Sequence, residues 1–193
     1  MADQTTDERL LERAASGDAA AFQILYERYR DAIFRFTYRL LGSVEAAEDV
    51  THDCFLSLIK APGRFDPARA SLRTYLYAAA RNLAVKQFNY FSRAAAIDEL
   101  AEEPAGWEND QPIRRVLDHE MAAQVEAAIS RLPPLQREAL VLFEYEDLSL
   151  AEIAAVVGAD IGTVKSRLFR AREQLRQRLS RYFRRDREAV RVS

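Results

Sequence analysis

The segment at residues 148–179 constrains the fold most, because it carries signals for two helices joined by a tight turn. Ser149 can cap a helix and Glu152, three residues later, can reach back to the cap, which is the capping-box pattern. Gly158 suits the left-handed conformation that ends a helix, and Asp160 can cap the next helix. This is the outline of a helix-turn-helix, a module that places its second helix in the DNA major groove.

The second of these helices separates into two faces. At about 100° per residue, one stripe is apolar: Ile161, Val164, Leu168, Ala171, Leu175 and Leu179. Away from this stripe lie the candidate DNA contacts: Thr163, Lys165, Ser166, Phe169 and Arg170. Such polar and basic side chains bind base edges or phosphates, and an apolar side chain can meet a thymine methyl. The alternative is a solvated, charged surface helix, which gives no reason for the large aromatic at position 169.

The net charge of −2 hides segments of strong and opposite charge. Residues 160–193 hold 11 Lys or Arg against 4 acids, and residues 61–97 hold 6 against one acid. Between them, residues 98–120 carry 8 acids against 2 arginines. Because clustered basic residues are the electrostatic footprint of nucleic-acid binding, two basic segments predict two separate DNA contacts.

Composition excludes several classes of protein. No run of about 18 apolar residues is present, so we expect no membrane insertion. The N-terminus is acidic and polar, unlike a secretory signal, and the single Cys54 excludes an internal disulfide. We therefore expect a cytoplasmic protein.

The first part of the chain is predicted to form four helices. Each starts at a residue that can cap a helix N-terminus: Thr5, in a capping box with Glu8, then Asp18, Ser43 and Ser71. Gly17 and Gly42 end the first two. The third helix has one acidic side: Glu45, Glu48, Asp49, His52 and Asp53. This side is either solvated or docks a basic partner.

The fourth helix interleaves basic and aromatic residues, among them Tyr75, Asn82 and Lys86. Cations bind phosphates and flat rings stack on unpaired bases, so this mixture favours single-stranded DNA. Aromatic side chains of this helix can instead pack on neighbouring helices, and we expect this for Tyr77 and Phe88. A metal or thiol site is not expected, because His52 and Cys54 point in different directions on a helix.

Residues 95–115 have little periodicity, many acids, prolines and a glycine, which predicts a flexible linker. The expected organisation is therefore a first domain at residues 1–94, the linker, a second domain at residues 116–183 and a basic tail at residues 184–193. In the second domain Pro133 stops one helix, and Pro134 suits the first position of the next. No segment is typical of a strand, so the fold class is all-α with two helical domains.

Taken in order, these segments resemble bacterial sigma factors of the extracytoplasmic-function (ECF) class in the sigma-70 superfamily. The resemblance covers about residues 10–179 and is carried by AEDVTHDCFLSLI, SLRTYLYAAARNLAV and SLAEIAAVVGADIGTVKSRLFRAREQL. It implies two domains, regions 2 and 4, that bind core RNA polymerase through its β′ clamp helices and β flap. It further implies promoter DNA and an anti-sigma factor as partners, with no cofactor, metal or catalytic residue.

The resemblance also assigns roles. Asp49, His52 and Asp53 match the helix that docks on the clamp helices. Four residues match the region that captures a base flipped from the melted minus-10 element: Phe65, Tyr75, Asn82 and Lys86, with Tyr75 standing where the family usually has Trp. Lys165, Ser166, Phe169 and Arg170 match the readers of the minus-35 element, and Thr163 matches a position near a phosphate at the helix start.

Two other functions compete with transcription initiation. A sigma-like decoy that only sequesters an anti-sigma protein would be expected to lose the promoter readers, yet Asn82, Lys165, Ser166 and Arg170 are present. A plain helix-turn-helix regulator leaves about the first hundred residues unexplained. An enzyme has no support, since no phosphate-binding glycine loop or catalytic triad is visible.

Overall fold

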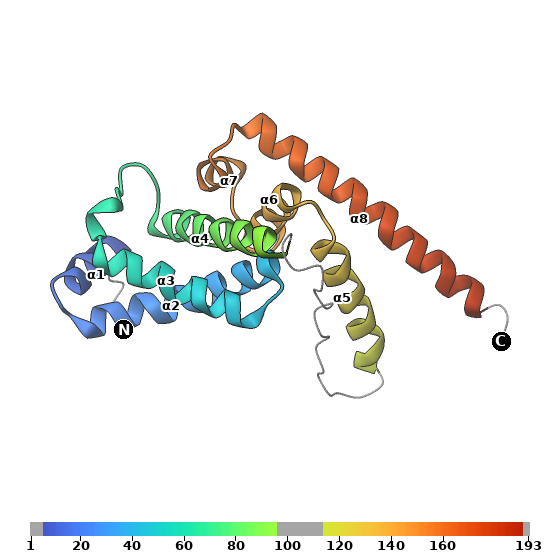
Figure 1. Ribbon diagram of the computed structural model, residues 1–193, viewed down its shortest axis with the longest axis horizontal. Coiled ribbons are helices and arrows are strands. Elements are labelled where there is room, and N and C mark those ends of the chain that lie inside the picture. Colours follow the sequence, from blue (N-terminus) through green and yellow to red (C-terminus); the bar gives the residue numbers. More distant parts are fainter. Residues whose placement is uncertain (1–5, 96–113, 191–193) are drawn as a thin grey trace.

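The computed structural model describes residues 6–95 and 114–190, and in these ranges the chain forms eight α-helices, one 3-10 turn and no strand. The expected all-α class is confirmed. The first group of elements is α1 (Asp7–Ala15), α2 (Ala19–Leu41), α3 (Val44–Lys60), η1 (Pro62–Arg64) and α4 (Leu72–Ala95). The second group is α5 (Arg114–Ser130), α6 (Pro134–Glu144), α7 (Leu150–Val157) and α8 (Ile161–Val190) (Figure 1). No helix of the described ranges is long and apolar enough to cross a membrane.

Most of the expected caps are present. The Asp18 side chain accepts hydrogen bonds from the first backbone N–H groups of α2, and Ser43 and Ser71 cap α3 and α4 in the same way. The capping box of Ser149 and Glu152 is complete at the start of α7. Gly158 ends α7 with φ of 64°, a left-handed conformation that only glycine adopts without steric cost.

The start of α1 differs from the expectation. Thr6 occupies the N-cap position and its side chain makes no capping hydrogen bond, while Thr5 lies outside the described residues. The Thr5–Glu8 capping box is therefore wrong as the start of this helix. The carboxylate of Asp7 lies in the first turn, where it bonds instead to Arg28 and Tyr29 of α2. These bonds tie the first turn of α1 to α2.

Helices α1 to α4 pack around an aromatic core. Phe36, Phe55 and Tyr77 are almost fully buried, and the rings of Phe36 and Tyr77 meet edge to face with centroids 5.3 Å apart. The expected packing role of Tyr77 is confirmed, whereas the side chain of Phe88 lies outside the described residues. Cys54 also lies in this core.

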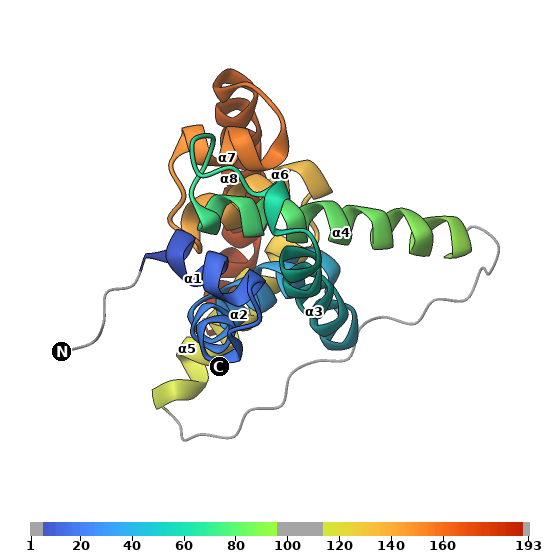
Figure 2. The same cartoon turned by 90° about the vertical axis from the view of Figure 1, so that its left-hand side faces the viewer.

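The two groups of helices share one continuous core. Helix α4 packs against α7, and α2 packs against α6, so residues from both groups belong to a single buried cluster. Figures 1 and 2 show α6 and α7 beside α4, and Figure 1 shows α8 running outward as a long rod. Because α8 continues to Val190, residues 184–190 of the expected tail belong to this helix.

Candidate nucleic-acid interface

The side chain of Asp160 caps the N-terminus of α8. Asp160 accepts hydrogen bonds from the Thr163 backbone N–H at 2.8 Å and from the Thr163 hydroxyl at 2.6 Å. These bonds, led by the hydroxyl, hold the pKa of Asp160 below its usual range. The hydroxyl proton of Thr163 is thus committed to Asp160, and an ionised carboxylate stands at the helix start. In this arrangement the residue helps to form the turn rather than offering a donor to phosphate.

The other four candidates on α8 are exposed. Phe169 is 71% exposed, the largest fraction among the exposed apolar side chains of the described residues. Lys165 and Arg170 lie beside it in solvent. The Ser166 hydroxyl donates to the Gly162 carbonyl oxygen at 3.0 Å, so its proton is used by the helix backbone while its oxygen can still accept a hydrogen bond. The structure therefore brings these four side chains together on one open face.

The other basic side chains in the described part of α8 form ion pairs or hydrogen bonds. Arg167 pairs with Glu138 at 3.4 Å, Arg172 with Glu144 at 2.6 Å and Arg176 with Glu173 at 2.6 Å, while Arg178 donates to a backbone carbonyl. Within the described part of the chain, Lys165 and Arg170 have no such partner. Two positive groups on the face that carries Phe169 thus remain unpaired among the described residues.

On the other candidate surface, Phe65 is largely buried. Its ring is 9% exposed and meets the ring of Tyr75 edge to face, with centroids 5.6 Å apart. Tyr75 is half-buried, and this burial raises the pKa of its hydroxyl. Phe65 therefore supports Tyr75 from beneath, and a base reaching this place would meet Tyr75 first.

Asn82 and Lys86 are exposed one turn apart on α4, on the side that also carries Tyr75. The four candidates thus follow one side of α4 from the η1 loop toward its C-terminal half. Lys86 also lines a groove of about 560 Å³ with Asp49 and Asp53 of α3. The two surfaces expected for DNA and polymerase therefore adjoin.

Two cations of the basic segment face away from this side. Arg73 donates to the backbone carbonyl of Glu146, and Arg81 forms an ion pair with Glu138. Both partners belong to the second group of helices. The number of basic residues counted at residues 61–97 is therefore larger than the number of unpaired cations on this side of α4.

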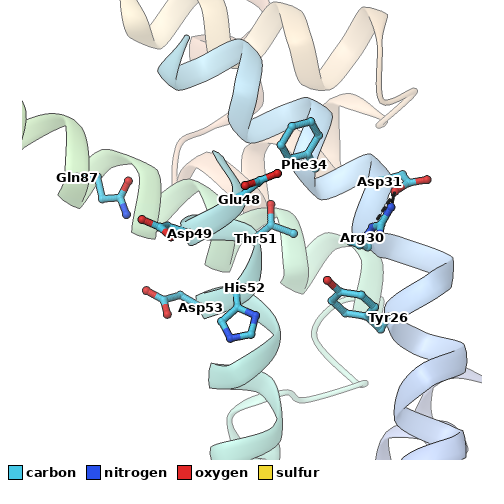
Figure 3. A pocket seen from close by; sticks show the side chains of 10 residues that line it. All are labelled: Tyr26, Arg30, Asp31, Phe34, Glu48, Asp49, Thr51, His52, Asp53 and Gln87. Carbon is cyan, nitrogen blue, oxygen red and sulfur yellow. Dashed lines mark hydrogen bonds and ion pairs between the residues drawn. The ribbon is translucent and has the colours of Figure 1, made fainter. Parts of the chain in front are cut away.

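The acidic side of α3 forms one wall of a groove of about 670 Å³. Figure 3 shows Asp49, His52 and Asp53 from α3 opposite Tyr26 and Arg30 from α2. All three α3 residues are exposed, so the structure brings the expected docking residues together on an open surface.

Cys54, by contrast, points into the core, where burial raises the pKa of its thiol to about 12. His52 and Cys54 thus point apart, as expected. No group of three or more His, Cys, Asp or Glu side chains among the described residues is arranged to hold a metal ion.

Two features were missed by sequence reasoning. The α2 wall of the groove was overlooked, although Tyr26, Arg30 and Phe34 recur at a spacing of four residues and so share one side of the helix. The buried acids Glu138 and Glu146 were also overlooked. No sequence signal marks them, because their partners lie between 29 and 69 positions away along the chain.

Comparison with known proteins agrees with this geometry. Residues 25–101 match the family model "Sigma-70 region 2", and residues 122–175 match "Sigma-70, region 4". The RNA polymerase sigma-H factor of Pseudomonas aeruginosa is 34% identical over 183 residues, covering 91% of this chain and 94% of that protein. The ECF RNA polymerase sigma-E factor of Escherichia coli K12 is 32% identical over 196 residues, covering 96% of this chain and 100% of that protein.

A solved structure shows the same fold. The sigma factor RpoE of Bartonella quintana, in complex with the anti-sigma factor NepR, superposes with a TM-score of 0.65. It is 24% identical, and the match covers 82% of this chain and 96% of that one. The chain belongs to the ECF class of sigma-70 family RNA polymerase sigma factors.

Proposed function

We propose that this chain directs core RNA polymerase to promoters, with α8 reading the minus-35 element and the exposed side of α4 capturing a melted minus-10 base. Family membership makes it a promoter-recognising factor. The observation that carries the assignment to α8 is its open face, where Lys165, Phe169 and Arg170 are exposed and the two cations have no partner among the described residues. Bidentate arginine contacts to guanine are the commonest specific contacts in the major groove.

In region 2, the proposed capture site is the line from Tyr75 to Lys86. Flipping a base out of the stack costs a few kcal/mol, which stacking and hydrogen bonds to its edge can offset. Tyr75 supplies a ring that Phe65 supports at 5.6 Å, and Asn82 supplies an amide that can both donate and accept. Lys86 then binds the phosphate of the same strand.

The acidic groove is the proposed docking site for polymerase. Asp49, His52 and Asp53 present exposed, mostly acidic groups to a basic partner, here the β′ clamp helices, while region 4 contacts the β flap. The Bartonella sigma factor is bound by an anti-sigma factor in its solved structure. We propose that an anti-sigma factor also regulates this chain.

The domain boundaries belong to this proposal. Region 2 occupies residues 1–94 and region 4 residues 116–183, and a linker at residues 95–115 joins them. The basic segment at residues 184–193 begins within α8. The protein acts in the cytoplasm as a dissociable, non-catalytic polymerase subunit. It needs no cofactor, because its work is binding and not bond chemistry.

Run-off transcription with purified core polymerase and a random promoter library tests the function. We expect transcripts from templates that share two sequence elements, and no transcripts from core polymerase alone. A Lys165→Ala/Arg170→Ala variant should initiate from templates with a relaxed upstream element. If the chain supports no transcription yet binds an anti-sigma factor, the decoy function replaces the proposed one.

A further inference from the structure

Arg64 lies beside the aromatic pair of the proposed minus-10 capture site. It is the last residue of η1, and two backbone hydrogen bonds of 3.1 Å, from the N–H groups of Arg64 and Phe65, close this turn. The ring of Phe65, the next residue, meets the ring of Tyr75 at 5.6 Å between centroids. The backbone of Arg64 is therefore fixed next to the site, while its side chain takes no part in forming the turn.

The Arg64 side chain is exposed and has no acidic partner among the described residues. Its charge acts on the capture site, because burial raises the pKa of the Tyr75 hydroxyl and the positive charge of Arg64 opposes that rise. The acid closest in sequence, Asp66, accepts the Ala68 backbone N–H at 3.0 Å and so belongs to the following turn. Arg64 thus places an unpaired positive group near the Tyr75 hydroxyl.

The cations of α4 are poorly placed for a nucleotide at Tyr75. Arg73 and Arg81 both bond to region 4. Lys86 follows Tyr75 by 11 residues, a distance of about 16 Å along the helix at a rise of about 1.5 Å per residue. A stacked strand advances about 3.4 Å per nucleotide, so Lys86 faces a phosphate several nucleotides away. A phosphate next to a base on Tyr75 therefore needs a cation from another element.

We propose that Arg64 binds the phosphate of the nucleotide whose base stacks on Tyr75, so that η1 holds the phosphate and α4 holds the base. This contact rests on the proposed capture of a melted base at Tyr75. The planar guanidinium of an arginine can donate two parallel hydrogen bonds to one phosphate. Because phosphate carries no sequence information, the contact positions the strand and leaves the choice of base to the side chains of α4.

The salt dependence of DNA binding tests the contact. The probe is a fluorescent single-stranded oligonucleotide carrying the minus-10 element of a promoter recovered from the random library, titrated with reconstituted holoenzyme. Each phosphate contact on a single strand contributes about 0.7 to the slope of log affinity against log salt concentration. Arg64→Ala should therefore make the slope about 0.7 less steep and weaken binding about fivefold at about 0.1 M salt. Arg64→Lys should keep the wild-type slope, because an ammonium also binds phosphate.

Arg69→Ala is the matched control. Arg69 is an exposed arginine of the same loop, and its backbone N–H donates to the Asp66 carbonyl oxygen at 3.0 Å. It has no acidic partner among the described residues, and its charge is not among those that shift the pKa of Tyr75. Removing it takes away the same charge, and we expect the wild-type slope. Equal changes in both variants would mean that the loop acts through its total charge, which would overturn the assignment to Arg64.

A double variant distinguishes a phosphate contact from support of the Tyr75 ring. If Arg64 acted only on the Tyr75 hydroxyl, Tyr75→Phe would abolish the effect of Arg64→Ala. We expect the full change of slope in the Tyr75→Phe chain, because a phosphate contact does not need the hydroxyl. Loss of the effect in that chain would overturn the phosphate contact.

Run-off transcription and circular dichroism separate the remaining outcomes. A folded Arg64→Ala chain with an unchanged slope, while wild type initiates transcription normally, would overturn the phosphate contact and leave the promoter function standing. A wild-type holoenzyme that initiates from no template would overturn the promoter function, and the contact with it.

Discussion

Arg170 and Arg172 lie two residues apart on α8 but in different surroundings. Arg172 pairs with Glu144, whereas Arg170 has no acidic partner among the described residues. We predict that Arg170→Ala weakens initiation by about 1–3 kcal/mol only at promoters whose minus-35 sequence matches. Run-off transcription on matched and mismatched templates measures this, with Arg172→Ala as the control. A uniform loss across all templates would mean that Arg170 binds phosphate and reads no base.

Burial is expected to lower the reactivity of Cys54. Its thiol has a pKa of about 12 because burial disfavours the thiolate, and the thiolate is the nucleophile. We predict that alkylation of the native protein at pH 8 is at least a hundredfold slower than in 6 M guanidinium chloride. Mass spectrometry of samples taken over time gives both rates. Similar rates would place Cys54 at the surface.

Phe169 was an anomaly in the sequence and is 71% exposed in the structure. Since little of its surface is buried, Phe169→Ala should not lower the free energy of unfolding measured in urea. It should instead change which minus-35 sequences are selected from a promoter library. A loss of stability with unchanged selection would assign the ring to packing.

At the scale of elements, local signals predicted most helix boundaries. Ser149, Gly158 and Asp160 act on backbone groups within a few residues, so the sequence contains all that is needed to place them. The predicted cap at Thr5 is wrong, since Thr6 is the N-cap, and the first turn of α1 instead bonds to α2 through Asp7. The Arg81–Glu138 pair could not be predicted either, because the partners lie 57 residues apart and no local pattern records tertiary pairing.

The capping box of α7 gives a prediction on stability. Ser149→Ala removes the side chain that accepts the Glu152 backbone N–H and should cost about 1 kcal/mol of unfolding free energy. Urea unfolding measures this, with Ser166→Ala, the same change inside α8, as the control that costs little. Hydrogen bonds from Ser149 lower the pKa of Glu152, so this contribution is present above its unfolded pKa. The difference should therefore shrink as acid protonates Glu152.

The acidic side of α3 carries a second prediction at this scale. Asp49→Lys reverses an exposed charge in the groove and should reduce co-purification with core polymerase by tenfold or more, while circular dichroism stays unchanged. Glu27→Lys is the control, since it makes the same reversal on α2 outside the groove. Equal losses in both variants would show that overall charge matters and not the groove.

At the scale of the whole molecule, the sequence predicted two helical regions but not their contact. Periodicity reports which side of a helix is apolar, yet it cannot tell which other helix covers that side. Arg73 and Arg81 therefore counted toward the basic segment at residues 61–97 in the sequence analysis, although in the structure both bond to region 4. Their pairing also reduces the positive charge that the free chain presents to phosphate.

This arrangement predicts weak promoter binding by the free protein. The net charge is −2, and some cations are paired internally. Polymerase holds both regions on one promoter, so the second contact gains from effective concentration. We expect gel shifts of the free chain to show promoter affinity at least a hundredfold below that of holoenzyme at the same salt concentration. Equal affinities would mean that one region alone supplies all the binding, and that polymerase adds nothing to promoter recognition.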